Sequence, residues 1–147
     1  MTMRREYVVL AGIFLATLAL RLYFSLQTPY FNYDGYFTVR QVEEILQHGI
    51  PSFNHLSYSE HVFLPGFHYL LAAVATFLPL PLTLKIVPNL LASTLVIISY
   101  LLAYDITKHR TAALFSAFAS GFIPVYFSET LNSLFVYSFV VPLALFL

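Results

Sequence analysis

An apolar run of about twenty residues near the N-terminus, residues 7–26, constrains the fold most strongly. Twenty residues of α-helix rise about 30 Å, the thickness of the hydrocarbon core of a bilayer. Arg4 and Arg5 precede the run. The alternative is a cleaved signal peptide with an apolar segment over 8–20, but no clear small-residue cleavage site follows. We therefore expect a transmembrane helix over 7–26, with Arg21 near its outer end reaching the interface.

The rest of the chain has the composition of a polytopic membrane protein. Apolar residues make up 59% and charged residues 10%, against about 25% charged residues in soluble domains. Mean hydropathy is +0.78. Three more apolar stretches predict transmembrane helices over 85–105, 111–127 and 133–147, the first with Pro88 in its first turn. We expect one all-α domain over 1–147, an integral membrane helix bundle with about four transmembrane helices.

Composition also excludes several kinds of site. The chain has no cysteine, so neither a disulfide framework nor a thiolate metal site is possible. The net charge is zero and no basic patch is visible, which argues against nucleic acid as a partner. The five histidines are spread through the chain without the spacing of a zinc site. Membrane lipids are therefore the first partners that the sequence predicts.

A long segment over 27–84 separates the first span from the second and is expected to be an external loop. Its first part, 27–62, holds four of the seven acidic residues. Residues 36–48 predict an interfacial amphipathic helix, which Gly49 and Pro51 end. One stripe of that helix would carry the apolar residues Tyr36, Val39, Val42 and Leu46.

Residues 64–80 are apolar, but their uninterrupted part is only about twelve residues, which suits a re-entrant or interfacial helix better than a span. The distribution of basic residues favours the same interpretation. With a cytoplasmic N-terminus and no crossing at 64–80, Lys108 and Arg110 fall on the cytoplasmic side, as the positive-inside rule requires. In the alternative, where 64–80 crosses, Lys85 is cytoplasmic and Glu129 lies opposite Asp34.

The external loop contains the residues that point most directly to chemistry. Asp34 stands in the aromatic sequence F-N-Y-D-G-Y-F-T-V-R, residues 31–40, and Asp34 followed by Gly35 is also an ordinary turn dipeptide. Arg40 could bind a phosphate in a forked geometry, or pair with acidic neighbours one helical turn away, Glu43 and Glu44.

Three further residues are candidates for the same external site. Glu60 and His61 precede the 64–80 segment and either line the site or belong to an exposed loop. Glu129 follows the third span and either joins Asp34 or caps the next helix at its N-terminus. An acidic residue at a membrane is costly unless it is paired or in a wet cavity, so each is a functional candidate.

The order of these features resembles the N-terminal region of GT-C superfamily glycosyltransferases, most closely the oligosaccharyltransferase catalytic subunits. Their first external loop carries an acidic motif of the outline D-[PG]-[YWF]-x-x-x-R, to which Y-D-G-Y-F-T-V-R is similar. The helix ending E-I-L-Q-H-G-I-P, the following L-P-G-F segment, and A-A-L-F-S-A-F-A-S-G-F-I-P-V-Y-F-S over 112–128 are similar too. The succession covers nearly the whole chain in order.

The resemblance implies a membrane glycosyltransferase that takes a sugar or glycan from a polyprenyl-phosphate-linked donor on the extracytoplasmic face. It implies a divalent cation, Mg²⁺ or Mn²⁺, with Asp34 as a catalytic metal ligand and Arg40 at the substrate. Glu129 would be the second catalytic metal ligand, and Glu60 and His61, from their place in the external loop, are further candidates for the substrate site. A hard cation suits carboxylate oxygens, and Mg²⁺ often uses only one or two of them. The expected location is the cell membrane, or the endoplasmic reticulum in a eukaryote, with the N-terminus in the cytoplasm.

The chain also departs from this family. Where the family has R-S and then a second acidic motif, this chain reads S-E-T-L-N over 128–132, so Glu129 would have to replace that motif. The chain has no tryptophan, so the family's tryptophan-rich acceptor motif is absent. Two interpretations follow: a transferase or the N-terminal part of one, and a non-catalytic membrane subunit that docks partner membrane proteins. A small transporter or channel has less support, because no charged relay is evident within the spans.

Overall fold

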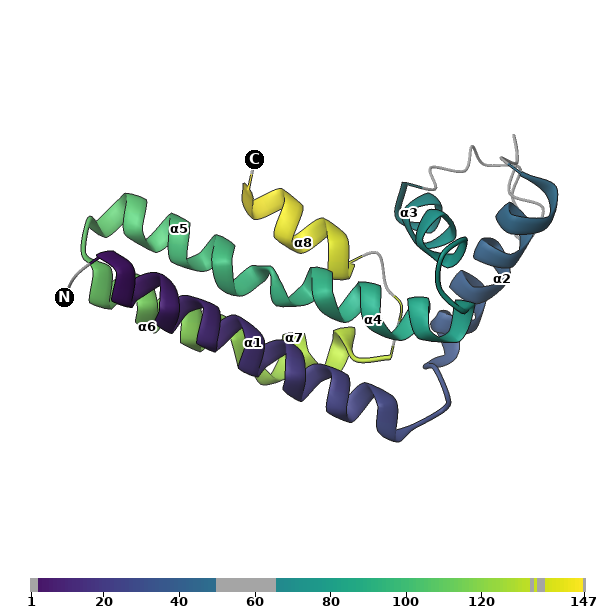
Figure 1. Cartoon of the computed structure of the whole chain (residues 1–147), viewed down its shortest axis with the longest axis horizontal. Coiled ribbons are helices and arrows are strands. Elements are labelled where there is room, and N and C mark those ends of the chain that lie inside the picture. Colours follow the sequence, from purple (N-terminus) through teal and green to yellow (C-terminus); the bar gives the residue numbers. More distant parts are fainter. Residues whose placement is uncertain (1–2, 50–65, 133, 135–136, 147) are drawn as a thin grey trace.

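The computed structural model describes residues 3–49, 66–132, 134 and 137–146, and every regular element in these ranges is a helix. Figure 1 shows their arrangement. The helices are α1 (Met3–Gln27), α2 (Tyr33–His48), α3 (Gly66–Ala75), α4 (Leu80–Ser93), α5 (Leu95–Thr107), α6 (Arg110–Gly121), α7 (Pro124–Thr130) and α8 (Tyr137–Phe146).

In the described ranges, two helical segments are long and apolar enough to cross a membrane: Arg5–Gln27 in α1, and Leu80–Thr107, formed by α4 and α5 together. Helices α6 and α7 make a third candidate if their 44° bend lies within one span. The protein thus has the helices of an integral membrane protein, with two or three candidate spans among the described residues. The expected fourth span over 133–147 stays a prediction, because α8 has only ten residues and a span needs about twenty.

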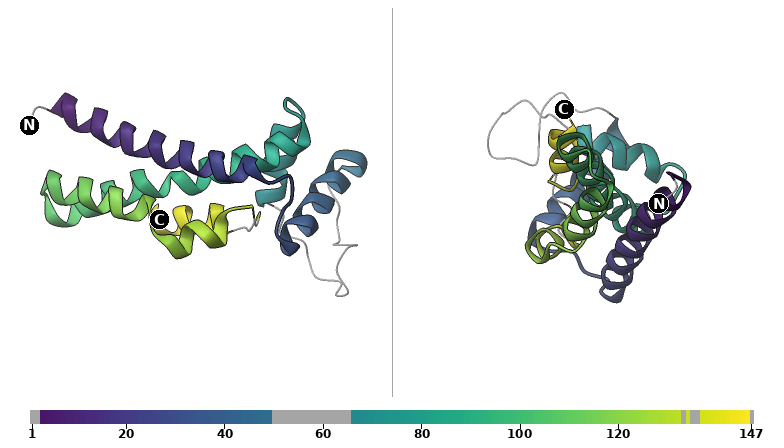
Figure 2. Two further views of the ribbon diagram at one scale, coloured as in Figure 1. Left: turned by 90° about the horizontal axis from the view of Figure 1, so that it is seen from below. Right: turned by 90° about the vertical axis from the view of Figure 1, so that its left-hand side faces the viewer.

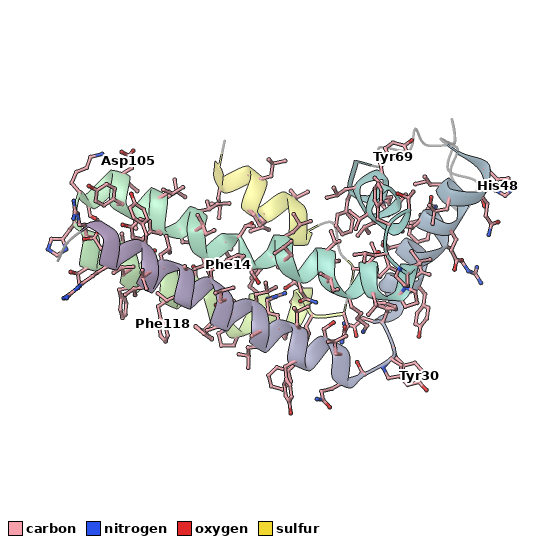
Figure 3. The ribbon with its side chains drawn as sticks, in the orientation of Figure 1. Phe14, Tyr30, His48, Tyr69, Asp105 and Phe118 are labelled. Atoms are coloured by element: carbon pink, nitrogen blue, oxygen red, sulfur yellow. The ribbon has the colours of Figure 1, made fainter. Side chains whose placement is uncertain are left out.

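The long helices lie side by side and share their two ends. Helix α1 runs from the N-terminus to the end where α2 and α3 lie, α4 and α5 return, and α6 and α7 follow α1 again (Figures 1 and 2). Tyr30 and His48 mark the end of the molecule that carries α2, and Asp105 marks the opposite one (Figure 3). We call these the α2 end and the N-terminal end.

Among the residues that the structure describes, apolar side chains form two buried clusters, one towards each end. At the α2 end, α2, α3 and α4 enclose a core that also takes in Leu134. Towards the N-terminal end, α1, α5 and α6 pack together. The first cluster contains Val42, Ile45, Phe67, Leu71, Ala72, Leu84, Val87 and Leu134, and the second Leu10, Val96, Tyr100, Ala113 and Ala117.

Small residues let α6 approach α1 and α5 closely. Ala113, Ala117 and Gly121 are buried and repeat every four residues, so they share one helix face. A Cβ atom on Gly121 would lie 2.6 Å from Oγ1 of Thr17 and 2.9 Å from Cγ2 of Val96. Small residues at helix crossings are typical of membrane bundles, where packing drives association in place of the hydrophobic effect.

Large apolar side chains cover much of the outer surface of the long helices. Tyr7 and Leu15 on α1, Ile106 on α5 and Phe115 on α6 are all more than half exposed, and Phe118 points away from the bundle (Figure 3). An apolar exterior of this kind is a liability in water but matches a hydrocarbon environment.

Helix α4 begins earlier than the sequence predicts, which changes the position of Pro88 within it. Helix α4 starts at Leu80, after Pro79 and with Pro81 in its first turn, so residues 81–84 are helical where the end of the external loop was expected. Pro88 accordingly lies inside α4 and removes the hydrogen bond to the carbonyl four residues earlier.

The apolar face of α2 is also rotated from the predicted stripe. Val42 and Ile45 are buried, whereas Tyr36 and Leu46 are exposed. The reason is that Val42 and Ile45 join the buried cluster that contains Phe67 and Leu71 of α3, a contact between segments that the stripe alone does not specify.

Candidate functional site

The α2 end brings together chain segments that are about one hundred residues apart. The amide of Asn32, the N-cap residue of α2, donates a hydrogen bond of 2.9 Å to the carbonyl of Asn132. Asp34 lies in the first turn of α2, and Glu129 lies in α7 three residues before Asn132. The backbone segments that carry the two predicted metal ligands therefore meet at the same end of the bundle, although the side chain of Asp34 is outside the described part.

Arg40 lines an open pocket of about 650 Å³ along α2, together with the described residues Tyr36, Phe37, Val39 and Glu43. Its guanidinium is exposed. Within the part of the chain that the structure describes, no ion pair joins Arg40 to an acidic neighbour. The local pairing that the spacing allowed is therefore not formed, and the charge faces the pocket region.

The other candidates are placed less completely. Glu129 is exposed and lies within α7, which ends at Thr130. It does not stand at the N-terminus of the following helix, because α8 begins only at Tyr137. Glu60 and His61 lie outside the described residues. Searched over the described residues alone, the structure has no group of three or more His, Cys, Asp or Glu side chains that could hold a metal ion.

The structure adds a feature that the sequence reasoning missed, a buried polar seam between α1 and α4. On α1 the seam contains Thr17, Arg21 and Ser25, and on α4 it contains Lys85, Asn89 and Ser93. Each set repeats every four residues, so it occupies one helix face. Ionisable groups inside a membrane bundle are costly and mark functional or strongly structural positions.

Arg21 is the centre of the seam and is only 1% exposed. Its Nε donates to Oδ1 of Asn89 over 3.1 Å, and its Nη2 donates to the hydroxyl of Thr130. The guanidinium also lies over the rings of Phe127 and Tyr126, 5.0 and 5.7 Å from their centroids. The expectation that Arg21 extends to the interface is wrong: the side chain turns inward, where α4 and α7 supply acceptors and ring faces.

Lys85 is the second buried cation, at 6% exposure. Its Nζ donates to the carbonyls of Thr28 and Tyr30 over 3.1 and 3.2 Å, and to Oδ1 of Asn132 over 2.6 Å. It also lies 4.3 Å from the ring centroid of Phe31. In the described residues neither Lys85 nor Arg21 is paired with a carboxylate, so neutral acceptors and aromatic faces stabilise both charges.

A signal for the seam was present in the sequence. Arg21 and Lys85 stand inside or at the edge of apolar stretches: Arg21 has Thr17 and Ser25 four positions to either side, and Lys85 is followed at the same spacing by Asn89 and then Ser93. Four-residue spacing predicts one helix face. The sequence does not show that the two faces meet, because that depends on how α1 and α4 pack. Comparison of the chain with family models, with curated proteins and with solved structures finds no match.

Proposed function

We propose that this chain is a membrane glycosyltransferase of GT-C type, or part of one, that uses a polyprenyl-phosphate-linked donor at the α2 end. The observation that carries the proposal is the backbone hydrogen bond between Asn32 and Asn132, which joins the segments bearing Asp34 and Glu129. The resemblance of residues 31–40 to the acidic motif of that family supplies the chemical identity. In the proposed orientation, the α2 end is extracytoplasmic and the N-terminal end is cytoplasmic.

Asp34 and Glu129 would hold a divalent cation, which suits a donor set of carboxylate oxygens completed by phosphate and water. Such a cation, when bound, stabilises the negative charge that develops on the leaving phosphate. Arg40 would bind a phosphate or sugar oxygen from the pocket along α2. Its guanidinium forms no ion pair with a neighbouring carboxylate among the described residues, so its charge can act on a ligand. Glu60 and His61 stay candidates for substrate contacts.

The direct test is Asp34→Asn in proteoliposomes that contain polyprenyl-phosphate- or polyprenyl-pyrophosphate-linked sugars and Mg²⁺ or Mn²⁺. Loss of a metal ligand removes several kcal/mol of transition-state stabilisation, so transfer should fall on the order of 100-fold. Asp105→Asn is the matched control, because Asp105 is an exposed carboxylate at the opposite end. Full activity of Asp34→Asn would rule out the metal role.

The second candidate is a non-catalytic membrane subunit that keeps this bundle and docks partner membrane proteins. The observation that favours it is the polar seam, in which the described contacts of Arg21 and Lys85 stabilise helix packing. Purification from its native membrane decides between the two. A subunit would copurify with other membrane proteins and bind neither Mn²⁺ nor the lipid-linked donor by itself.

A further inference from the structure

Asn132 connects three parts of the α2 end through almost all of its polar atoms. Its Oδ1 accepts hydrogen bonds from the hydroxyl of Ser25 over 2.7 Å and from Nζ of Lys85 over 2.6 Å. Its Nδ2 donates to Oγ1 of Thr28 over 3.1 Å, and its carbonyl accepts from the amide of Asn32. Through these hydrogen bonds Asn132, the second residue after α7, is joined to α1, to the connection between α1 and α2, and to α4.

The backbone of Asn132 is suited to this role. Its φ is +57°, in the left-handed region, which asparagine adopts more readily than most other residues. The conformation turns the chain sharply after α7, so that both the side chain and the carbonyl of Asn132 face the other segments.

Lys85 completes the arrangement from α4. An ammonium group has three N–H donors, and Lys85 has three acceptors at hydrogen-bond distance, the carbonyls of Thr28 and Tyr30 and Oδ1 of Asn132. No donor is left for a ligand such as a lipid phosphate. The ammonium group of Lys85 therefore binds only acceptors of the chain itself, and it holds the connection from α1 to α2 against the turn after α7.

We propose that Lys85 and Asn132 form a clamp that sets the separation between the first turn of α2 and α7, and so positions Asp34 relative to Glu129. The catalytic consequence rests on the proposed function; the clamp itself does not. Both are positioning residues, because they act through the backbone segments that carry the two carboxylates. Loosening the clamp should weaken binding of a shared cation without removing either ligand.

A distance measurement tests the clamp independently of activity. The chain has no cysteine, so Tyr30→Cys and Ser128→Cys, both at exposed positions, can carry a pair of nitroxide labels for pulsed electron resonance in proteoliposomes. The intact clamp should give one narrow distance distribution. Lys85→Met keeps most of the length of the side chain but removes its donors, and it should shift the distance distribution or make it at least twice as wide.

Two more variants keep the test decisive. Asn132→Gly removes the side-chain hydrogen bonds while tolerating positive φ, so it should fold and still broaden the distribution. Lys108→Met, which removes an exposed lysine at the opposite end, should leave the distribution unchanged. Distributions for Lys85→Met and Asn132→Gly that match the parent would overturn the clamp.

A second experiment measures how the rate of sugar transfer depends on the Mg²⁺ concentration. Loosening the support of a metal site typically costs 10–100-fold in metal affinity, so Asn132→Gly should raise the Mg²⁺ concentration for half-maximal transfer by about tenfold, while saturating Mg²⁺ restores most of the rate. If Asn132→Gly has the same Mg²⁺ dependence as the parent while Asp34→Asn is inactive, only the positioning role of the clamp is overturned. If the parent transfers no sugar from any donor, the proposed function fails, and the distance measurement still decides whether the clamp exists.

Discussion

Arg21 of α1 donates a hydrogen bond of 3.1 Å to Asn89 of α4, and both side chains are buried. The two residues are 68 positions apart. A buried guanidinium needs acceptors, because water cannot reach it and desolvating a charge is expensive. The hydrogen-bond acceptor that Asn89 provides for Arg21 of α1 is therefore supplied only when α4 packs against α1.

The Arg21–Asn89 contact predicts the effect of Asn89→Ala. Removing the acceptor leaves a buried charged donor without its partner, which should lower the free energy of unfolding by about 1.5–3 kcal/mol. Thermal unfolding in detergent measures the change. Gln47→Ala, which shortens an exposed amide on α2, is the control and should stay within about 0.5 kcal/mol of the parent. Equal stability of the two variants would contradict a structural role for the contact.

Gly121 predicts a packing effect. A Cβ at this position would be 2.6 Å from the hydroxyl of Thr17 and 2.9 Å from Cγ2 of Val96, so Gly121→Val must displace these side chains or move α6 away from them. Overpacking of this kind costs about 1–3 kcal/mol, measured as a lower unfolding temperature. Gly12→Val is the matched control, because no atom lies within 4 Å of a Cβ placed there. If both variants unfold alike, close packing at Gly121 is not important for stability.

The N-terminal end is held by an ion pair between Glu6 and Arg110, whose Oε1 and Nη1 are 2.8 Å apart. Glu6 is almost fully buried, whereas the Asp105–Lys108 pair nearby is exposed. A double-mutant cycle with Glu6→Gln and Arg110→Gln should give a coupling energy above about 1 kcal/mol. The same cycle on Asp105 and Lys108 should give less than about 1 kcal/mol, because exposed pairs are screened. Similar values for both would show that burial does not strengthen the first pair.

His68 predicts how stability changes with pH. Burial in α3 lowers the pKa of His68 below its usual 6.5, because the charged imidazolium loses its hydration. The unfolded chain then binds more protons than the folded one below pH 6.5. The stabilisation is complete above pH 6.5 and is lost as pH falls toward the folded pKa, by at most about 1.4 kcal/mol per pH unit.

Denaturation measured between pH 7.5 and 5 checks this expectation. His68→Gln cannot titrate and should reduce the loss of stability on acidification, while His109→Gln, at an exposed position, should leave that loss as in the parent. Identical pH profiles for the parent and His68→Gln would show that burial of His68 does not govern the acid response.

The apolar runs determined by themselves that this chain is helical and suited to a membrane, because a backbone in hydrocarbon must satisfy its hydrogen bonds within each segment. The charge and spacing of Asp34 and Arg40 singled out the start of α2 as a candidate site. The hydrogen bond between Asn32 and Asn132, the inward turn of Arg21 and the three acceptors around Lys85 were decided only by the tertiary structure. The physical reason is that a polar residue on an apolar helix can turn outward to the interface or inward to a partner. The packing of distant helices, which local spacing does not encode, selects between the two.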